Sequence, residues 1–581
     1  MQSFQEYASE KLILELLIKE RVKVALKDKL QHVSPVVTMH KATSGSHLTI
    51  AEQIFMLMPP RDSWHRPRRK ERLKAQGTKE KSRKQVLTRS LALTIKHHRR
   101  TPDAHPYLQR LDAFIHALRA EIMSDVPLTF RSIKVVGKKK KVDADGVIIL
   151  RPLCLFESLT EKLLIALASR YLSYVFDPLL HEEILSYRPL RLYHQSPSPV
   201  LTDRDNAIAN LRDYCARHRH HHLYVAECDI QKYFDTINHD VIRECFAHFA
   251  QRVQQQHPTF DYSPVGRIVD AYLNSYSFYH NVVVDNDHLL CSVPPRRYEC
   301  PKQALFVERG CYTEAVFEAS KDKIGIPQGG ALSGLISNVV LSTIDNASIL
   351  AMPDPHRFFC RYGDDILLIH TSKVKCRALI DAYCAALSEN KLLYHEFVSV
   401  GDAQFRHPDG TIRTSLWDQK SREPFLWGRS VGDPESVDWI GFLGYEMRYT
   451  GEVRLRRSSL NDKFRSIKRK YRRIAKSNLA KGLESHRSPH DVEDALLRQV
   501  DRFAGDGLSG AKSLTRNKYS LTQALKLNQY MSRHLYRLLY KAVRRNHLSP
   551  EILERCWQAA KDKGCINYLK TLGMDDVSLK D

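Results

Sequence analysis

The sequence predicts an α+β fold, because strand-like and helix-like apolar patterns are mixed within one unit. Short β-branched runs alternate with longer segments whose apolar residues recur at helical spacing. The chain has 581 residues, of which 43% are hydrophobic and 27% charged. This ordinary globular composition allows a buried core and argues against a fibrous or disordered chain. At about 100–200 residues per domain, the length allows about three or four domains.

The first 145 residues are expected to form a helical, basic N-terminal extension. Helical spacing predicts helices over residues 4–30 and 108–122. Residues 61–90 are polar and contain Pro67 and Gly77, so a loop or arm is expected there.

The core is expected in residues 146–445. Apolar runs predict strands at residues 147–150 and 222–229, and a strand-turn-strand unit at residues 358–370. Helical spacing predicts helices at residues 155–176, 240–255, 334–350 and 375–389. Residues 282–323 contain Pro294, Pro295 and Pro301 and are expected to form an irregular insertion. Residues 446–581 are expected to be basic and helical to the end.

The net charge of +24 is concentrated in two segments. Residues 61–100 carry 15 basic and 3 acidic residues, and residues 451–481 carry 12 basic and 2 acidic residues. A solvated helix would carry more acids for pairing, so both segments favour contact with a phosphate backbone. An anionic membrane surface is a weaker alternative, because neither segment has a clear apolar face.

Other features limit the location and the metal chemistry. No apolar run approaches the ~18 residues of a spanning helix, and the N-terminus lacks a secretory apolar region, so we expect a cytoplasmic protein with no membrane partner. The 12 cysteines include no Cys-x-x-Cys pair, which indicates scattered reduced thiols.

Three aspartates stand out by their position. Asp229 ends an apolar strand, and Asp364 and Asp365 lie between two apolar strand-like runs. Adjacent acids in such a turn are unfavourable for folding unless a cation offsets their charge. Carboxylate oxygens suit Mg²⁺, which takes the rest of its shell from water and substrate phosphates.

Four ordered motifs carry a resemblance to a known family. They are Asp-Ile-Gln-Lys-Tyr-Phe-Asp-Thr-Ile at 229–237, Gly-Ile-Pro-Gln-Gly-Gly-Ala-Leu-Ser-Gly at 325–334, Tyr-Gly-Asp-Asp at 362–365 and Phe-Leu-Gly-Tyr at 442–445. They resemble motifs A, B, C and E of reverse transcriptases. Arg151-Pro152 and Ser186-Tyr187-Arg188-Pro189 resemble the fingers motifs of that family. The nearest resemblance is to bacterial enzymes of the group II intron-like lineage, over about residues 147–475.

The resemblance implies a right-hand polymerase fold with fingers, palm and thumb. It implies an RNA-directed DNA polymerase that copies an RNA template into cDNA from dNTPs by two-metal-ion nucleotidyl transfer. Asp229, Asp364 and Asp365 would be catalytic. With Ile230 they would hold two Mg²⁺ ions, for which Mn²⁺ is a possible substitute.

The same resemblance assigns binding residues. Phe234 matches the steric gate that excludes a 2′-hydroxyl, with core packing as the alternative. Gln328 and Gly329 match the loop beside the incoming nucleotide, together with Ile230. Arg151 and Arg188 match residues that hold triphosphate or template, with a structural ion pair as the alternative. The basic segment after motif E would track the duplex through Arg454, Arg456, Arg457, Lys468, Arg469, Lys470, Arg472 and Arg473.

Two motifs depart from the family pattern. Ile148, Ile149 and Leu150 precede Arg151 where the family usually has a lysine, so Lys138–Lys141 are expected to hold phosphate instead. Residues 392–397 lack the lysine that commonly ends motif D. The general acid for pyrophosphate is therefore unassigned, and His395 is a candidate.

Several alternatives stay open. An RNA-dependent RNA polymerase is the nearest rival enzyme, and an inactive nucleic-acid-binding scaffold is the non-enzyme alternative. The long N- and C-terminal regions resemble the unknown-group reverse transcriptases associated with antiphage defence, which favours that role over an intron-type maturase or mobile-element enzyme. Template-independent or protein-primed synthesis would use a C-terminal tyrosine: Tyr519, Tyr530, Tyr536, Tyr540 or Tyr568. A dedicated noncoding RNA, a second copy of the chain or a partner protein are the possible partners.

Overall fold

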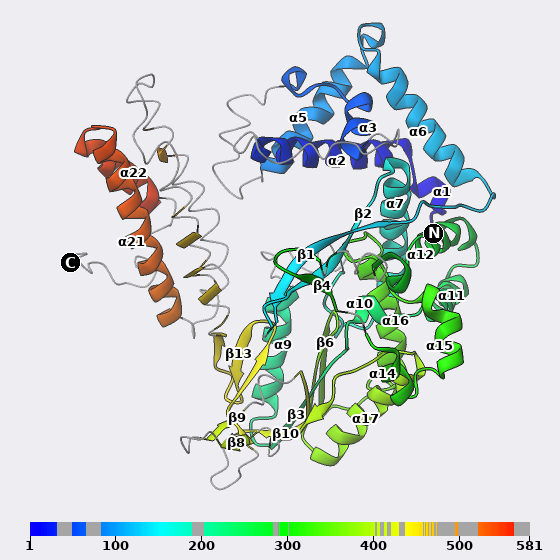
Figure 1. The fold of residues 1–581 in the computed structure, drawn as a ribbon, viewed down its shortest axis with the longest axis vertical. Helices are drawn as coiled ribbons and strands as arrows, with labels where there is room; N and C mark the ends of the chain where they lie inside the picture. The colour runs from blue at the N-terminus through cyan, green and yellow to red at the C-terminus, as the bar shows by residue number, and fades with distance from the viewer. Residues whose placement is uncertain are drawn as a thin grey trace.

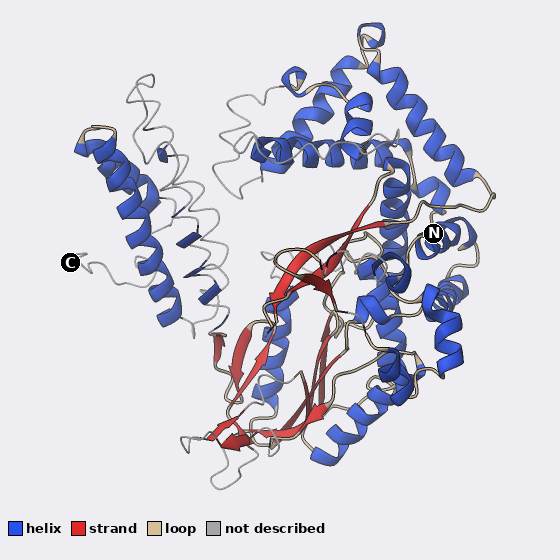
Figure 2. Ribbon diagram, viewed as in Figure 1, coloured by secondary structure: helices blue, strands red, loops and turns tan. Residues whose placement is uncertain are grey.

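The computed structural model describes residues 1–31, 49–65, 83–143, 145–188, 203–282, 289, 291–299, 301–400, 420–428, 436–456 and 521–562, with short pieces at 404–406, 412–414 and between 458 and 497. The strands form the centre of the molecule, the N-terminal helices lie above them, and helices α21 and α22 lie to one side (Figure 1). Most of the other helices gather on one side of the strands (Figure 2).

The central sheet has six strands, of which five follow the order β11-β10-β3-β6-β5 while β7 pairs with β10. Their bounds are β3 Leu223–Asp229, β5 Arg357–Tyr362, β6 Asp365–His370, β7 Phe397–Val398, β10 Ser421–Trp427 and β11 Ser436–Val437. Strand β3 is antiparallel to both β6 and β10, and β5 is antiparallel to β6. The predicted strands at 222–229 and 358–370 are therefore confirmed as neighbours.

Helices cover both faces of this sheet, which explains why its strands are apolar throughout. Val225 and Leu367 belong to the apolar cluster that includes α9 (Asp203–Arg217). Cys228 and Leu368 belong to the other cluster, which includes α17 (Lys373–Glu389). Successive side chains of one strand thus enter opposite cores, as the pleat requires.

A second sheet of three strands lies beside the first. It has the order β1-β2-β4, with β1 Lys134–Val142, β2 Ile148–Leu155 and β4 Arg296–Tyr298. β1 and β2 form an antiparallel hairpin, so the expected domain boundary at residue 145 falls inside one unit. β4 runs parallel to β2 and comes from the segment that was expected to be irregular.

The helices of the central region begin close to where the sequence predicts them. Their bounds are α7 Leu159–Phe176, α10 Tyr233–Thr236, α11 His239–Gln256, α12 Ser263–Asn274 and α16 Ser333–Ala347. α7 begins later than expected because Ser158 accepts a hydrogen bond from the backbone of Glu161 and caps the helix. Asn238 caps α11 in the same way.

The segment 282–323 is not irregular, and that expectation is wrong. It begins in a short π-helix, Phe278–Val282, and contains β4, α14 Gln303–Glu308 and α15 Glu314–Ser320. Phe306 and Phe317 bury their rings in a small core of their own, which stabilises the two helices.

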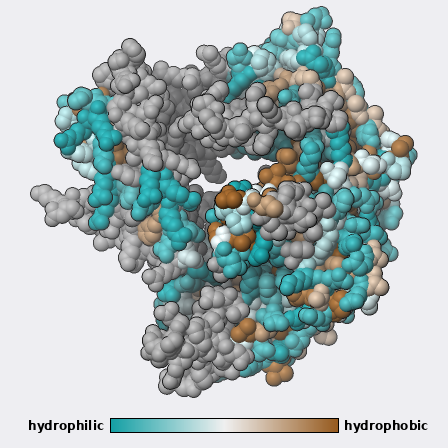
Figure 3. Space-filling model, viewed as in Figure 1, coloured by the Kyte–Doolittle hydropathy of each residue, from teal (hydrophilic) through white to brown (hydrophobic). Residues whose placement is uncertain are grey.

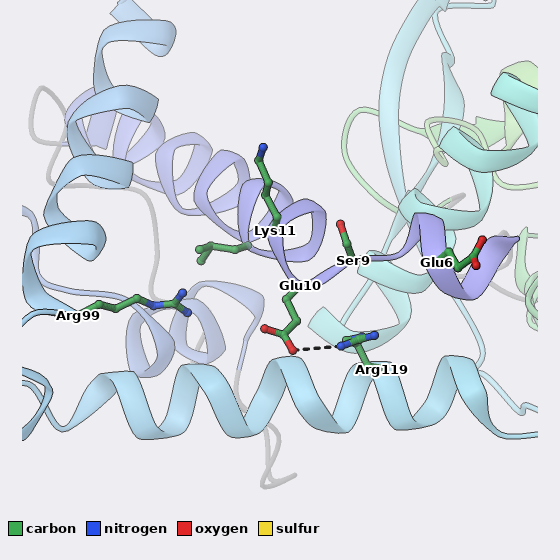
Figure 4. A pocket seen from close by; sticks show the side chains of 7 residues that line it. Glu6, Ser9, Glu10, Lys11, Arg99 and Arg119 are labelled. Carbon is green, nitrogen blue, oxygen red and sulfur yellow. Dashed lines mark hydrogen bonds and ion pairs between the residues drawn. The ribbon is translucent and has the colours of Figure 1, made fainter. Parts of the chain in front are cut away.

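The N-terminal helices pack on one another and on α7. Their bounds are α1 Phe4–Tyr7, α2 Glu10–Gln31, α3 Ile50–Leu57, α5 Arg83–His98 and α6 Tyr107–Met123. The expected helix over 4–30 is broken near Ala8, where α1 ends. Figure 4 shows Arg119 of α6 reaching Glu10 of α2, with 3.1 Å between Nη1 and Oε1. In the space-filling view an opening separates these helices from the strands (Figure 3).

The chain after Gly444 does not become helical at once, which corrects that expectation. β12 Trp439–Phe442, β13 Tyr445–Arg448 and β14 Val453–Leu455 form an antiparallel sheet. A small hairpin, β8 Gln404–Arg406 with β9 Ile412–Thr414, precedes it. The described C-terminal helices are α21 Leu521–Arg545 and α22 Pro550–Asp562. No helix in the described ranges combines the length and apolar character that a membrane crossing requires.

Candidate active site

Strands β3 and β6 bring the three predicted aspartates to one end of the central sheet. Asp229 is the register partner of Asp365 in the β3–β6 pair. The turn before β6 contains Gly363 with a φ of 72°, a conformation that glycine adopts without strain. The Gly363 amide donates to Ser186 Oγ at 2.7 Å, which fixes the turn. Residues far apart in the chain thus meet at one edge.

The aspartates face two different hollows. Asp229 and Asp364 line a cleft of about 1260 Å³. Asp365 and Asp229 line a second, smaller hollow beside the β12–β13 turn. Adjacent residues of an extended chain point in opposite directions, which places Asp364 and Asp365 on opposite sides. Two carboxylates therefore share the main cleft, and the third lies behind them.

Burial and mutual repulsion make these carboxyls costly to ionise. Burial raises the pKa of Asp364, and the nearby Asp229 raises it further. Burial, followed by the charges of Asp364 and Asp229, raises the pKa of Asp365 to about 6. A cation placed between such groups would lower their pKa values and stabilise the ionised forms.

Two basic side chains already contact Asp229. Lys420 donates from Nζ to Asp229 Oδ2. His395 lies with Nε2 3.7 Å from the same oxygen, and its amide donates to the Asp229 carbonyl at 3.0 Å. Burial lowers the pKa of His395, although Asp229 opposes that effect. Neutral His395 and charged Lys420 thus share one carboxylate.

Lys420 is a site residue that the sequence did not reveal. It precedes β10, which pairs antiparallel with β3 so that Arg422 faces Glu227. Two residues earlier on β10 correspond to two residues later on β3, which brings Lys420 to Asp229. Finding it required knowledge of that pairing, because no motif surrounds it in the chain.

Most of the expected nucleotide-binding residues line the main cleft. They are Arg151, Ile230, Phe234, Gln328 and Gly329. The Gln328 amide donates to Asp235 Oδ1 at 2.8 Å, and its carbonyl accepts from the Cys154 amide at 3.0 Å. Gly329 has a φ of 88°, which requires glycine or costs strain. The loop is therefore held against β2 with its backbone exposed to the cleft.

Phe234 is placed between the two roles that the sequence left open. Its ring packs partly against the main core and also lines the cleft. The ring of Tyr233 meets it edge-on, at 5.4 Å between centroids. The ring is thus held rigidly at the cleft wall.

A group of lysines surrounds Glu299 at the same cleft. Its carboxylate oxygens lie 3.2 Å from Lys141 Nζ, 3.5 Å from Lys140 Nζ and 3.8 Å from Lys232 Nζ. Arg297 and Lys302, from the same segment as β4, line the cleft as well. The segment beginning at β4 was not expected here, because its pairing with β2 is long-range.

Arg188 does not reach the cleft. Its guanidinium donates to both carboxylate oxygens of Asp177, at 2.9 and 3.3 Å, and to the carbonyls of Asp177, His181 and Ile184. Only 8% of the residue is exposed. The alternative weighed for it, a structural ion pair, is the arrangement that the structure contains, because a buried guanidinium needs all its donors paired.

The expected nucleic-acid-binding residues fall into three groups. Arg454 is committed, since Nε lies 2.6 Å from Glu446 Oε2 and the guanidinium stacks 3.9 Å over Trp439. Arg456 lines the hollow beside Asp365. Lys468, Arg469 and Arg472 are exposed. Arg457, Lys470 and Arg473 lie outside the described residues.

The chemistry of the donor set fits a hard divalent cation. Within the described ranges no three His, Cys, Asp or Glu side chains converge on one point, in keeping with two cleft carboxylates and one behind them. Mg²⁺ commonly uses one or two protein carboxylates and completes its shell from water and phosphate. The Lys420 ammonium, which sits on Asp229, shows that this position accepts positive charge.

Comparisons with known proteins place the site in context. No curated protein matches the chain. Apo telomerase from Candida tropicalis is similar at 12% identity, covering 75% of this chain and 71% of that chain, with a TM-score of 0.34. Telomerase from Candida albicans in complex with a TWJ fragment of telomeric RNA is similar at 13% identity, covering 78% and 68%, with a TM-score of 0.28. Likeness at this level carries no conclusion about activity.

The family comparison is more specific. Residues 139–396 match the family model described as "Reverse transcriptase (RNA-dependent DNA polymerase)". The matched range contains three of the four quoted motifs and both sides of the cleft. Domains of this family use divalent metal ions. The chain therefore carries a reverse transcriptase domain and is an enzyme of the RNA-directed DNA polymerase class.

Proposed function

We propose that the protein copies an RNA template into cDNA by nucleotidyl transfer with two Mg²⁺ ions at Asp229 and Asp364. The observation that carries this proposal is the pair of carboxylates facing one cleft, with a third behind them. Bound there with the Ile230 carbonyl, the ions would activate the primer 3′-hydroxyl and neutralise the leaving pyrophosphate. Mn²⁺ is expected to substitute, since it uses the same oxygen ligands.

In this proposal the chain itself positions the nucleotide. Arg151 and the lysines around Glu299 hold the triphosphate through charge-assisted hydrogen bonds. Phe234 presses against the sugar and excludes a 2′-hydroxyl. Gln328 and Gly329 form the floor under the base, where the glycine backbone allows close approach.

Lys420 supplies the general acid that the motifs left unassigned. Its ammonium contacts Asp229 and lines the cleft, so it can reach an oxygen of the departing pyrophosphate. Transfer of one proton from Nζ to that oxygen improves the leaving group. His395 is the less suitable donor, because burial favours its neutral form.

The architecture is interpreted as a right hand. The central sheet with α11, α16 and α17 corresponds to a palm, and the β1–β2–β4 sheet to fingers. The basic segment from Arg456 to Arg472 and the C-terminal helices correspond to a thumb along the duplex. The N-terminal helices form an extension that packs on α7.

Primer extension on a primed RNA template tests the proposal. The wild type is expected to prefer dNTPs over NTPs, and Phe234→Val is expected to narrow that preference. Asp364→Asn should lower the rate by at least about 10³-fold, equivalent to about 4 kcal/mol. Asp381→Asn, which changes an exposed aspartate on α17, is the matched control and should extend normally. Preference for NTPs would instead indicate an RNA polymerase, and activity in Asp364→Asn would indicate a scaffold.

We further infer that the enzyme acts in bacterial antiphage defence, in the cytoplasm, on an RNA dedicated to it. The support is the family resemblance combined with the long N-terminal region. A phage challenge that compares the wild type with Asp364→Asn tests this role. Protection that is equal in both, or absent in both, contradicts it, and sequencing of copurified nucleic acid identifies the template.

A further inference from the structure

One face of helix α21 contains only basic residues and tyrosines. From residue 533 onward, the exposed positions recur at spacings of three and four, which is one side of a helix. The residues of this face are Arg533, Tyr536, Arg537, Tyr540, Lys541 and Arg544. The 25 residues of α21 include no aspartate or glutamate. We call this set the α21 basic face.

The opposite side of the helix already serves for packing. Leu535, Leu539 and Val543 are almost fully buried and belong to the same apolar cluster as Ile552 and Cys556 of α22. The α21 basic face is therefore not needed to hold the helix in place. Its side chains project into solvent from a fixed support.

The two tyrosines form a flat aromatic surface in the middle of this face. Their rings stack with 6.3 Å between centroids and 15° between planes. Tyr536 is 44% exposed and Tyr540 46% exposed. The edge of Trp557 on α22 meets Tyr536 at 5.2 Å, which holds its ring in place. Two large rings thus remain accessible in a fixed orientation, flanked by cations.

This combination separates nucleic acid from the other surfaces that attract cations. A helix kept soluble by ion pairs would carry acids at spacings of four, and α21 has none. A helix that lies on a membrane needs an exposed apolar side, but the leucines here are buried in protein. Stacked aromatic rings between basic residues are typical of sites that bind unpaired bases and their phosphates.

We propose that the α21 basic face binds the single-stranded part of the RNA template. Bases of a duplex are stacked on one another, so they offer no free face to Tyr536 or Tyr540. An unpaired strand offers both its bases and a flexible backbone, which the four cations can follow. In RNA-directed synthesis the template arrives unpaired, whereas the product leaves the active site paired with it. The template is therefore the strand that this face meets.

Binding of three labelled hybrids to the full-length protein tests the proposal, with no nucleotide present so that catalysis plays no part. The first hybrid has a 20-nucleotide single-stranded RNA template overhang, the second is blunt, and the third has a 20-nucleotide overhang on the DNA primer strand. Tyr536→Ala/Tyr540→Ala is expected to weaken binding of the first by roughly tenfold or more. Binding of the other two should change less than about twofold.

Matched variants separate stacking from other roles. Tyr536→Phe/Tyr540→Phe keeps both rings and should bind like the wild type, whereas a role for the hydroxyls, such as priming, predicts that it fails. Tyr540→Ala alone leaves the Tyr536–Trp557 contact in place and should still lose several-fold. Equal losses on all three hybrids, a loss confined to the DNA overhang, or no loss in either alanine variant would each overturn the proposal.

The cations allow a second, independent measurement. Each phosphate contact of a single strand contributes about 0.7 to the slope of log affinity against log salt concentration. Arg537→Gln/Lys541→Gln should therefore reduce the slope for the RNA-overhang hybrid by about 1.4 relative to the blunt hybrid. An unchanged slope would show that these residues do not contact the strand.

Discussion

Two groups of charged side chains lie close together along strands β5 and β6 and differ in every physical respect. Arg361 of β5 pairs with Asp345 of α16 at 2.6 Å, and both side chains are fully buried. Arg361 also reaches Ser342 Oγ at 3.1 Å and the Gly363 carbonyl at 3.3 Å. Asp229, Asp364 and Asp365 sit at the strand ends with few partners. A buried ion with matched partners holds the fold together, whereas crowded carboxylates beside a cleft are available to a ligand.

The largest effect expected from this contrast is on folding. Arg361→Met leaves Asp345 buried without its partner, which should lower the free energy of unfolding by about 3–5 kcal/mol. Asp364→Asn removes a repelled charge and should leave stability unchanged or higher. Urea denaturation of both variants measures the difference.

The control for that experiment removes both partners at once. Arg361→Met/Asp345→Leu replaces the ion pair by apolar groups and should recover much of the loss. If Asp364→Asn proved as destabilising as Arg361→Met, the distinction between structural and available carboxylates would fail.

A buried histidine gives the next effect, which depends on pH. His239 Nε2 donates to the Gly325 carbonyl at 2.7 Å and so ties the start of α11 to the loop that contains Gln328. Burial lowers the pKa of His239 to about 4. Above pH ~6.5 the ring is neutral in both folded and unfolded chains. Between pH ~6.5 and about 4 only the unfolded chain binds the proton, so the free energy of unfolding should fall as pH falls, by on the order of 3 kcal/mol.

His239→Gln keeps a donor for Gly325 and cannot titrate. Its stability should lack this part of the acid sensitivity, although it is somewhat lower at neutral pH. Denaturation series at several pH values for the two proteins, compared by difference, isolate the contribution of His239. Parallel curves would show that the histidine is protonated in the folded state as easily as in the unfolded chain.

The open group gives the next prediction, on rate alone. Lys420→Gln should lower kcat by about 10²-fold with little effect on stability, because its side chain is 60% exposed. Lys420→Arg keeps the positive charge but is a poor proton donor, so it should be nearly as slow. Single-turnover extension on the same primed RNA measures both. Full activity in the arginine variant would show that charge, and not proton transfer, is what Lys420 provides.

The sequence predicted the aspartates well and their surroundings poorly, for one physical reason. Asp229 and the Tyr362–Asp365 turn belong to short contiguous motifs, and the strand patterns beside them are local. Lys420 and Glu299 reach the cleft only through pairing of β10 with β3 and of β4 with β2. Such long-range pairing leaves no local signal. Arg188 shows the converse, because a motif position alone did not reveal that Asp177 would bind it.

Glu299 gives the smallest effect and sharpens the comparison further, since it is a carboxylate that neither holds the fold nor faces the metal position. With Lys140, Lys141 and Lys232 around it, its carboxylate occupies the place where a triphosphate would bind. Partly exposed ion pairs of this kind contribute at most about 1 kcal/mol. Glu299→Gln should therefore lower KM for dNTP by up to about fivefold with kcat unchanged, and Glu308→Gln on α14 serves as the control. A higher KM in Glu299→Gln would instead mean that the carboxylate orients the lysines for the triphosphate, so the sign of this small change decides between competitor and support.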